Sequence, residues 1–139
     1  MKFGLLLPLC ALLQPCALFQ RSTRPERAPP EEASRVQFPL DLPADTRTVL
    51  PGATVTAMQL ALEDFLPLDT KPHQGATAEE RCLYQRESYD VIASPGPEGA
   101  MFVRVTLRPG VCEQHGPIMD MEATYAVDVA RRRILAVQR

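Results

Sequence analysis

The chain has 139 residues, which is enough for one modest domain with short appendages. It carries 15 basic and 17 acidic residues, a formal net charge of −2, so general binding to nucleic acids or to anionic membranes is not expected. Its 14 prolines are unevenly placed and divide the chain into segments of different character.

Residues 1–17 predict a signal peptide, because Lys2 precedes an apolar run that ends at the small residues Cys16 and Ala17. The run is shorter than the ~20 apolar residues of a membrane-spanning helix. Cleavage after Ala17 would give a secreted protein. Lipidation of Cys16 is the alternative, since Leu13 and the residues after it partly resemble a bacterial lipoprotein signal. We therefore expect an exported protein, either lipid-anchored in the periplasm or outer membrane or secreted.

Residues 18–45 predict a disordered, proline-rich linker, because the segment is mostly polar, mixed in charge and poor in apolar surface. Such a segment would act as a tether if Cys16 is lipidated. Apolar side chains alternate from Val36 onward, but Pro39 and Pro43 exclude a central strand there. An extended edge segment is the most that we expect.

Residues 46–139 predict an α+β domain whose first element is a helix beginning at Pro51 and ending at Leu66, before Pro67. Apolar residues recur at helical spacing along this segment, which favours a helix face that packs on a sheet. The stripe consists of Ala57, Met58, Ala61, Leu62 and Phe65.

The helix is followed by a loop at residues 67–76 and by a capping-box pattern, Thr77-x-x-Glu80, which predicts a short helical turn. From about Tyr84 the pattern becomes extended. A proline- and glycine-rich turn at residues 94–99 then predicts a hairpin with the next strand.

The strand Met101–Arg108 shows the clearest alternation in the chain and is expected to be central in its sheet. A third strand is expected over residues 121–129, and a turn at Arg131–Arg133 would return the chain as a short fourth strand over residues 134–137. The fold class is therefore α+β, with one helix packed on an antiparallel meander of three or four strands.

Of the four cysteines, Cys10 and Cys16 are removed or blocked by either form of processing, so Cys82 and Cys112 predict a disulfide. They flank the two strands of the hairpin at the same end. The alternative is a metal site in which Cys112 and His115 are joined by Cys82 or His73. A structural zinc site needs four ligands, and no second close-spaced pair is present, so no cofactor is expected.

Neither a Gly-x-Ser-x-Gly turn nor a phosphate-binding glycine loop occurs, which favours a non-catalytic protein. The candidate ligand or partner face consists of Tyr125 with Arg131, Arg132 and Arg133. Arginines there could contact an anionic lipid or an acidic protein. The alternative is a charged hairpin turn exposed to water.

Residues 124–135 resemble the end of small cystatin-like or PepSY-like domains of bacterial envelope proteins. The matching pattern is a Tyr-x-Val-Asp-Val strand from Tyr125 to Val129, a short turn, and the apolar pair Ile134 and Leu135. The resemblance implies a non-catalytic envelope domain that binds or shields something. The Gln-x-Val-x-Gly segment of true cystatins is absent, so the resemblance does not imply protease inhibition.

Three functions follow as hypotheses. The first is an exported interaction or structural module that binds an envelope or extracellular protein. The second is a small-ligand pocket between helix and sheet, with His115 or Asp120 as its polar or hydrolytic group. The third is a secreted protease inhibitor that uses the Pro109–Pro117 loop as a wedge. The predicted pocket lining is Met58, Phe65, Met101 and Tyr125.

Overall fold

The computed structural model describes residues 25–112 and 121–139, and the chain divides into two units, Met1–Ala44 and Asp45–Arg139. The signal peptide predicted at residues 1–17 and the lipidation predicted at Cys16 lie outside the described residues.

The described part of the first unit is exposed throughout and contains one helical turn, α1 (Pro30–Ala33). Pro30 begins the turn, acidic residues occupy it, and the Ser34 hydroxyl donates to the Glu31 carbonyl at 3.0 Å. Proline at the first helical position and acidic side chains near the positive end of the helix both favour such a turn. The segment predicted to be a disordered linker therefore includes local structure, whereas its residues 36–44 form no strand.

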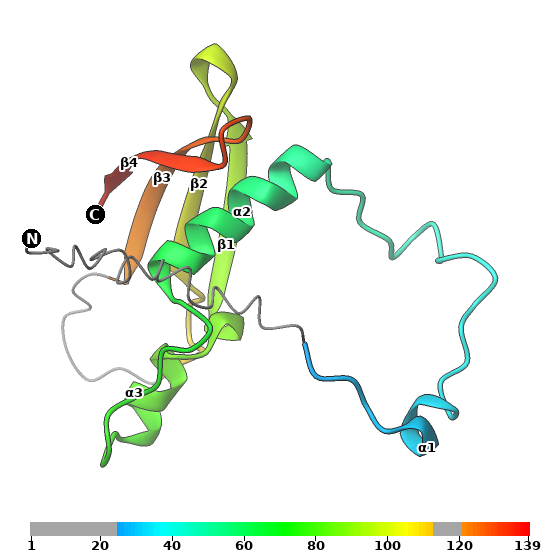
Figure 1. The fold of residues 1–139 in the computed structure, drawn as a ribbon. Helices are drawn as coiled ribbons and strands as arrows, with labels where there is room; N and C mark the ends of the chain where they lie inside the picture. Colours follow the sequence, from blue (N-terminus) through cyan, green and yellow to red (C-terminus); the bar gives the residue numbers. More distant parts are fainter. Residues whose placement is uncertain (1–24, 113–120) are drawn as a thin grey trace, which may run out of the picture. The chain divides into compact units, whose positions relative to one another are not determined.

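The second unit is a four-stranded antiparallel sheet with helix α2 (Gly52–Phe65) lying across one face (Figure 1). The strands occur in the sheet in chain order, and α2 contacts all four of them. Their bounds are β1 Tyr89–Pro95, β2 Ala100–Leu107, β3 Glu122–Asp128 and β4 Arg133–Gln138. The prediction of an α+β domain with an antiparallel meander is confirmed.

Strand β2 lies between β1 and β3, as predicted for a central strand, although it begins and ends one residue earlier. Val103 and Val105 are fully buried beneath α2, while Phe102 and Arg104 point to the opposite face. The period of two in the sequence therefore separates a core face from a second face, which no helix of the described residues covers.

Helix α2 begins after Pro51, one residue later than predicted, and packs on the sheet through Ala57 and Ala61, which are fully buried. These small side chains let the helix backbone approach the strands closely. At its end the Arg86 guanidinium donates to the carbonyls of Leu66 at 2.8 Å and of Leu62 at 3.3 Å. Arg86 thus gives a donor to the Leu66 carbonyl after the helix, and a second donor to the Leu62 carbonyl, which already accepts from the Leu66 N–H at 2.9 Å.

Helix α3 (Ala78–Leu83) begins with the predicted capping box. The Thr77 hydroxyl accepts from the Glu80 N–H at 3.1 Å, and the Glu80 carboxylate accepts from the Thr77 N–H at 2.7 Å. The chain then forms a short 3-10 turn, η1 (Arg86–Ser88), so strand β1 begins at Tyr89 and the prediction of extended structure from Tyr84 is wrong. Buried Ser88 explains the turn, because its hydroxyl donates back to the Cys82 carbonyl at 2.7 Å.

A disulfide joins Cys82 in α3 to Cys112 after β2, with Cα atoms 5.8 Å apart, as predicted. At the opposite end of the hairpin, the turn η2 (Pro97–Gly99) connects β1 to β2. The β1–β2 hairpin is therefore crosslinked by the disulfide at one end and closed by the tight turn η2 at the other.

Candidate functional site

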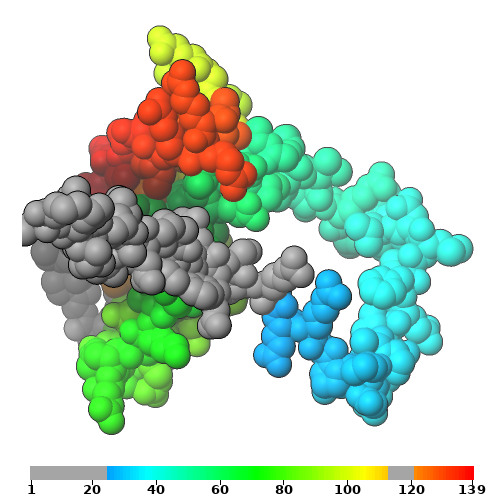
Figure 2. Space-filling view, viewed as in Figure 1, coloured from blue at the N-terminus to red at the C-terminus, as the bar shows by residue number. Residues whose placement is uncertain are grey.

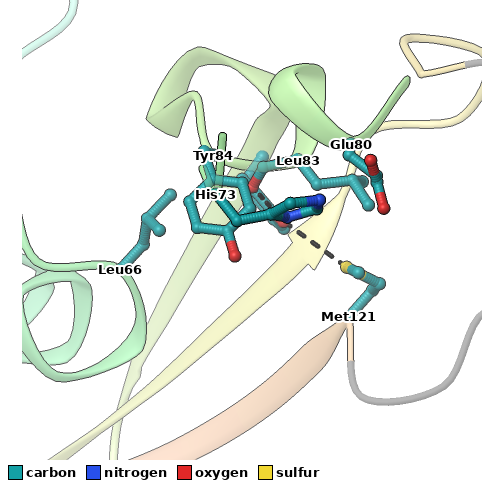
Figure 3. A pocket seen from close by; sticks show the side chains of 7 residues that line it. Leu66, His73, Glu80, Leu83, Tyr84 and Met121 are labelled. Atoms are coloured by element: carbon teal, nitrogen blue, oxygen red, sulfur yellow. Dashed lines mark hydrogen bonds between the residues drawn. The ribbon is translucent and has the colours of Figure 1, made fainter. Parts of the chain in front are cut away.

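A hollow of about 300 Å³, which we call the α3 pocket, opens between the end of α2, the loop before α3, α3 itself, the first residue of β1 and the residue before β3 (Figure 3). Its volume is at the lower end of the range for small-molecule sites. Its walls are mainly apolar, with few polar groups. The lining residues are Leu66, His73, Glu80, Leu83, Tyr84, Tyr89 and Met121.

Tyr89 forms a fixed wall of the α3 pocket. Its hydroxyl donates to the Leu83 carbonyl at 2.9 Å and lies 3.5 Å from the Met121 sulfur, the contact marked in Figure 3. Its ring meets the Phe65 ring edge to face at a centroid distance of 5.1 Å. Burial raises the pKa of the Tyr89 phenol, so this side chain stays neutral and holds its position through the donated hydrogen bond.

Glu80 supplies the negative charge of the α3 pocket. The Thr77 N–H that donates to its carboxylate is the main reason that the pKa of Glu80 lies below its ordinary value, and His73 adds to this effect. Figure 3 shows the ring nitrogens of His73 directed toward the Glu80 carboxylate. The pocket therefore combines an apolar interior with an ionised carboxylate and an imidazole.

A second candidate surface is the sheet face opposite α2, which we call the bare face and define by Ile92, Phe102, Ala126 and Leu135. Ile92, Phe102 and Leu135 are 58%, 39% and 51% exposed. Phe102 lies opposite Ala126 in the register of β2 and β3, so apolar side chains continue from one strand to the next. Large apolar side chains grouped on one exposed face are typical of interaction surfaces.

The bare face meets a shallow hollow of about 400 Å³ between η2 and the β3–β4 turn. The turn itself stands at the surface in Figure 2, in orange. The hollow has an apolar floor and a charged border. Its lining residues are Pro97, Glu98, Gly99, Ala100, Phe102, Ala126, Asp128, Arg131, Arg133 and Leu135.

Asp128 organises the arginine-rich turn between β3 and β4. Its carboxylate accepts from the Arg131 N–H at 3.0 Å and from Arg133 Nε at 3.2 Å. The Arg131 backbone hydrogen bond, followed by the hydrogen bond from Arg133 and the charges of both guanidinium groups, lowers the pKa of Asp128. Arg132 occupies the left-handed region with φ of 51°, which completes the tight turn.

The structure does not bring together all four residues predicted as a partner face. Arg131, Arg132 and Arg133 lie in the exposed turn, whereas Tyr125 is fully buried on the face beneath α2. Among the described residues, no group makes a hydrogen bond of ordinary geometry to the Tyr125 hydroxyl. Burial raises the pKa of the Tyr125 phenol, and Asp64 adds to this effect.

The residues predicted to line a pocket between helix and sheet belong to the hydrophobic core, because Met58, Phe65 and Met101 pack against buried Tyr125 and its neighbours. The α3 pocket lies elsewhere and contains none of them. The capping box indicates Glu80, but no sequence period links the loop that carries His73 to Met121, the residue before β3. His115 and Asp120, predicted as the polar group, lie outside the described residues.

Within residues 25–112 and 121–139, no three His, Cys, Asp or Glu side chains are grouped so that they could hold a metal ion. Cys82 and Cys112 are bonded to each other, which removes both thiolates from the alternative zinc set. The loop proposed as a protease wedge, Pro109–Pro117, is described only as far as Cys112. The described part of the chain also has no helix long and apolar enough to cross a bilayer.

Comparison with protein-family models, with curated proteins and with solved structures found no match to this chain.

Proposed function

We propose that this protein is an exported, non-catalytic interaction module that binds another protein of the cell envelope or the extracellular space through its bare face. The observation that carries the proposal is the exposure of Ile92, Phe102 and Leu135 on the sheet face opposite α2. Export rests on the predicted signal peptide at residues 1–17, and the same sequence supports lipid anchoring at Cys16 as one form of the protein.

The polar side chains around the bare face favour a protein as its binding partner. Arg104 Nε lies 3.4 Å from the Glu122 carboxylate and 3.3 Å from the Thr124 hydroxyl, so polar side chains already form contacts with one another around the apolar residues. An apolar centre with a polar rim is the usual arrangement in a protein–protein interface. The rim pairs contribute little stability in water, which leaves them available to exchange partners.

The positive charge of the β3–β4 turn, at the other border of the bare face, indicates which kind of partner segment would bind. The side chains of Arg131 and Arg133 are 73% and 54% exposed, and together with Arg132 they outnumber the carboxylates of Asp128 and Glu98 beside them. Arginine presents several donors to a carboxylate in a planar arrangement. The partner segment that fits is therefore apolar at its centre and carries Asp or Glu side chains at one end.

A cystatin-like or PepSY-like fold is the finer part of the proposal. It is supported by the packing of α2 across a meander whose strands are in chain order, and by the Tyr-x-Val-Asp-Val strand that ends in an arginine-rich turn. Domains of that kind bind or shield rather than catalyse, which agrees with the role proposed for the bare face.

The test is site-specific photocrosslinking in cells that make the protein. A photoreactive residue is placed at Phe102 and, in a matched control, at Leu68, which is 64% exposed in the loop after α2. We expect Phe102 to crosslink one protein that Leu68 does not capture, and the combined Arg131→Ala and Arg133→Ala variant to lose that product. Equal products at both positions, or capture of a second copy of this chain alone, would contradict the proposal.

A further inference from the structure

We propose that the α3 pocket binds a primary ammonium group carried on a short apolar stem. The pocket shares no residue with the bare face, so this inference stands apart from the proposed function. It rests on the contrast between the walls of the pocket and its single carboxylate.

The walls suit an apolar stem. Leu66, Leu83 and Met121 line the α3 pocket, and Tyr89 contributes its ring while its hydroxyl is already used by the Leu83 carbonyl. A ligand therefore meets apolar surface and an occupied donor in this part of the pocket. A volume of about 300 Å³ admits a small group of this kind and excludes a large ring system.

The charge of the pocket selects a cation. Among the described residues that line the pocket, Glu80 is the one carboxylate, its pKa lies below the ordinary value, and none is an arginine or a lysine. The Thr77 N–H occupies Glu80 Oε2, and within the described chain no donor occupies Oε1. An ammonium group can donate to Oε1, while an anionic ligand would be repelled by the same carboxylate.

Aromatic and imidazole groups complete the cation site. Tyr84 is 39% exposed at the end of α3, and its ring lines the pocket together with His73. In Figure 3 the nitrogens of the His73 imidazole are directed toward Glu80. A tyrosine ring attracts a cation through its face, and an imidazole nitrogen without a hydrogen can accept a hydrogen bond from the same ammonium group.

Two sources supply this chemistry, namely a free amine and a lysine side chain of a partner protein. The first experiment therefore titrates the full, disulfide-bonded chain with hexylammonium, with Nα-acetyl-lysine methylamide and with hexanol, monitored by amide chemical shifts. We expect saturable shifts at the residues lining the α3 pocket for hexylammonium, and an affinity for hexanol about tenfold weaker. Binding of the lysine derivative as well would identify a partner side chain, and its failure would identify a free amine.

The second experiment removes the charge and keeps the fold. Glutamine also completes a capping box, so Glu80→Gln retains the start of α3 while it removes the carboxylate. We expect this variant to bind hexylammonium about tenfold more weakly and hexanol unchanged, whereas the matched control Glu98→Gln, on the other hollow, binds both as the parent does. Tyr84→Leu, at a half-exposed position, should lower only the ammonium affinity, by a few-fold.

The proposal is overturned if hexanol binds as tightly as hexylammonium, if Glu80→Gln leaves the ammonium affinity unchanged, or if no shifts appear around the pocket at millimolar hexylammonium. A melting curve for each variant shows that it is folded. If Glu80→Gln proves unfolded, the Tyr84→Leu comparison decides the question, because Tyr84 caps α3 only with its backbone.

Discussion

The two faces of the sheet receive alternate residues of the same strands, yet their surroundings differ completely. On one face Val103, Val105 and Tyr125 are fully buried beneath α2, and on the other Phe102 and Leu135 keep 39% and 51% of their surface exposed. Apolar burial supplies most of the favourable free energy of folding. The comparison therefore assigns stability to the covered face and leaves the bare face available for recognition.

Helix α2 causes this difference, because it lies across all four strands on one side and has no counterpart among the described residues on the other. Substitutions on the covered face should change the free energy of unfolding and leave partner binding intact. Substitutions on the bare face should weaken partner binding and leave the free energy of unfolding nearly unchanged.

Removing the disulfide should have the largest effect on stability. The bond closes a segment with a sequence separation of 30, for which the chain-entropy relation gives about 3–4 kcal/mol. The double variant Cys82→Ala and Cys112→Ala should lose this amount in urea unfolding. The bond joins α3 to the residues after β2 and belongs to neither face of the sheet. Its removal should therefore leave unchanged the ratio between the stability losses caused by substitutions on the covered face and on the bare face. A loss below about 1 kcal/mol would contradict this estimate.

A matched pair of truncations tests the comparison directly. Val105→Ala removes two methyl groups from a fully buried site and should lower the free energy of unfolding by about 2 kcal/mol. Ile92→Ala, at a site 58% exposed on the bare face, should cost less than about 1 kcal/mol. Urea denaturation of both variants gives the two values. Equal losses would show that the bare face is part of the stabilising core.

Loss of the hydrogen bonds from Arg86 to the end of α2 should lower the free energy of unfolding by less than the Val105→Ala substitution does. Arg86→Met keeps much of the side-chain volume but removes the hydrogen bonds that Arg86 donates to the carbonyls of Leu66 and Leu62, and it removes the 3.0 Å ion pair with Glu63. The Leu62 carbonyl keeps its bond from the Leu66 N–H. We expect a loss of about 1–2 kcal/mol, measured by thermal unfolding.

The control for Arg86 is Arg104→Met on the side of the sheet away from α2, which should change stability by less than about 0.5 kcal/mol. A result in which both variants lose the same amount would mean that Arg86 acts only as a surface charge.

The smallest effect is expected for Glu122→Gln, which breaks the exposed 3.4 Å pair with Arg104 at the border of the bare face. Exposed pairs contribute little, so the free energy of unfolding should change by about 0.3 kcal/mol or less and the change should vanish in high salt. If this variant nevertheless loses the Phe102 crosslink, then Glu122 acts in partner binding. A large stability loss that persists in salt would contradict the assignment of this border to recognition.

Much of the fold could be predicted from local patterns. Alternation located β2 to within one residue, helical spacing located α2, and the Thr77-x-x-Glu80 pattern located the start of α3, because each is set by neighbouring residues. The disulfide followed from the positions of Cys82 and Cys112 at one end of a hairpin.

The candidate surfaces were harder to predict. Alternation shows which residues share a face but not which face a helix covers. Tyr125 is predicted on a partner face as one of several aromatic residues of the sheet, yet it has the same spacing as buried Val127 and is itself fully buried. The α3 pocket joins a loop residue, His73, to Met121 far along the chain. Such a pairing follows from the way η1 redirects the chain, and the turn includes a hydrogen bond from the Ser88 hydroxyl to the Cys82 carbonyl, which no periodic pattern reveals.

The order of the strands also has a kinetic consequence. Each strand pairs with its neighbour in the chain, so most sheet contacts form across short loops and at a low entropic cost, which favours rapid folding. The β1–β2 hairpin lies between Cys82 and Cys112, and closing it brings the two thiols to the same end. We therefore expect the hairpin to form before Cys82 and Cys112 are oxidised, so that the disulfide fixes a topology that is already present.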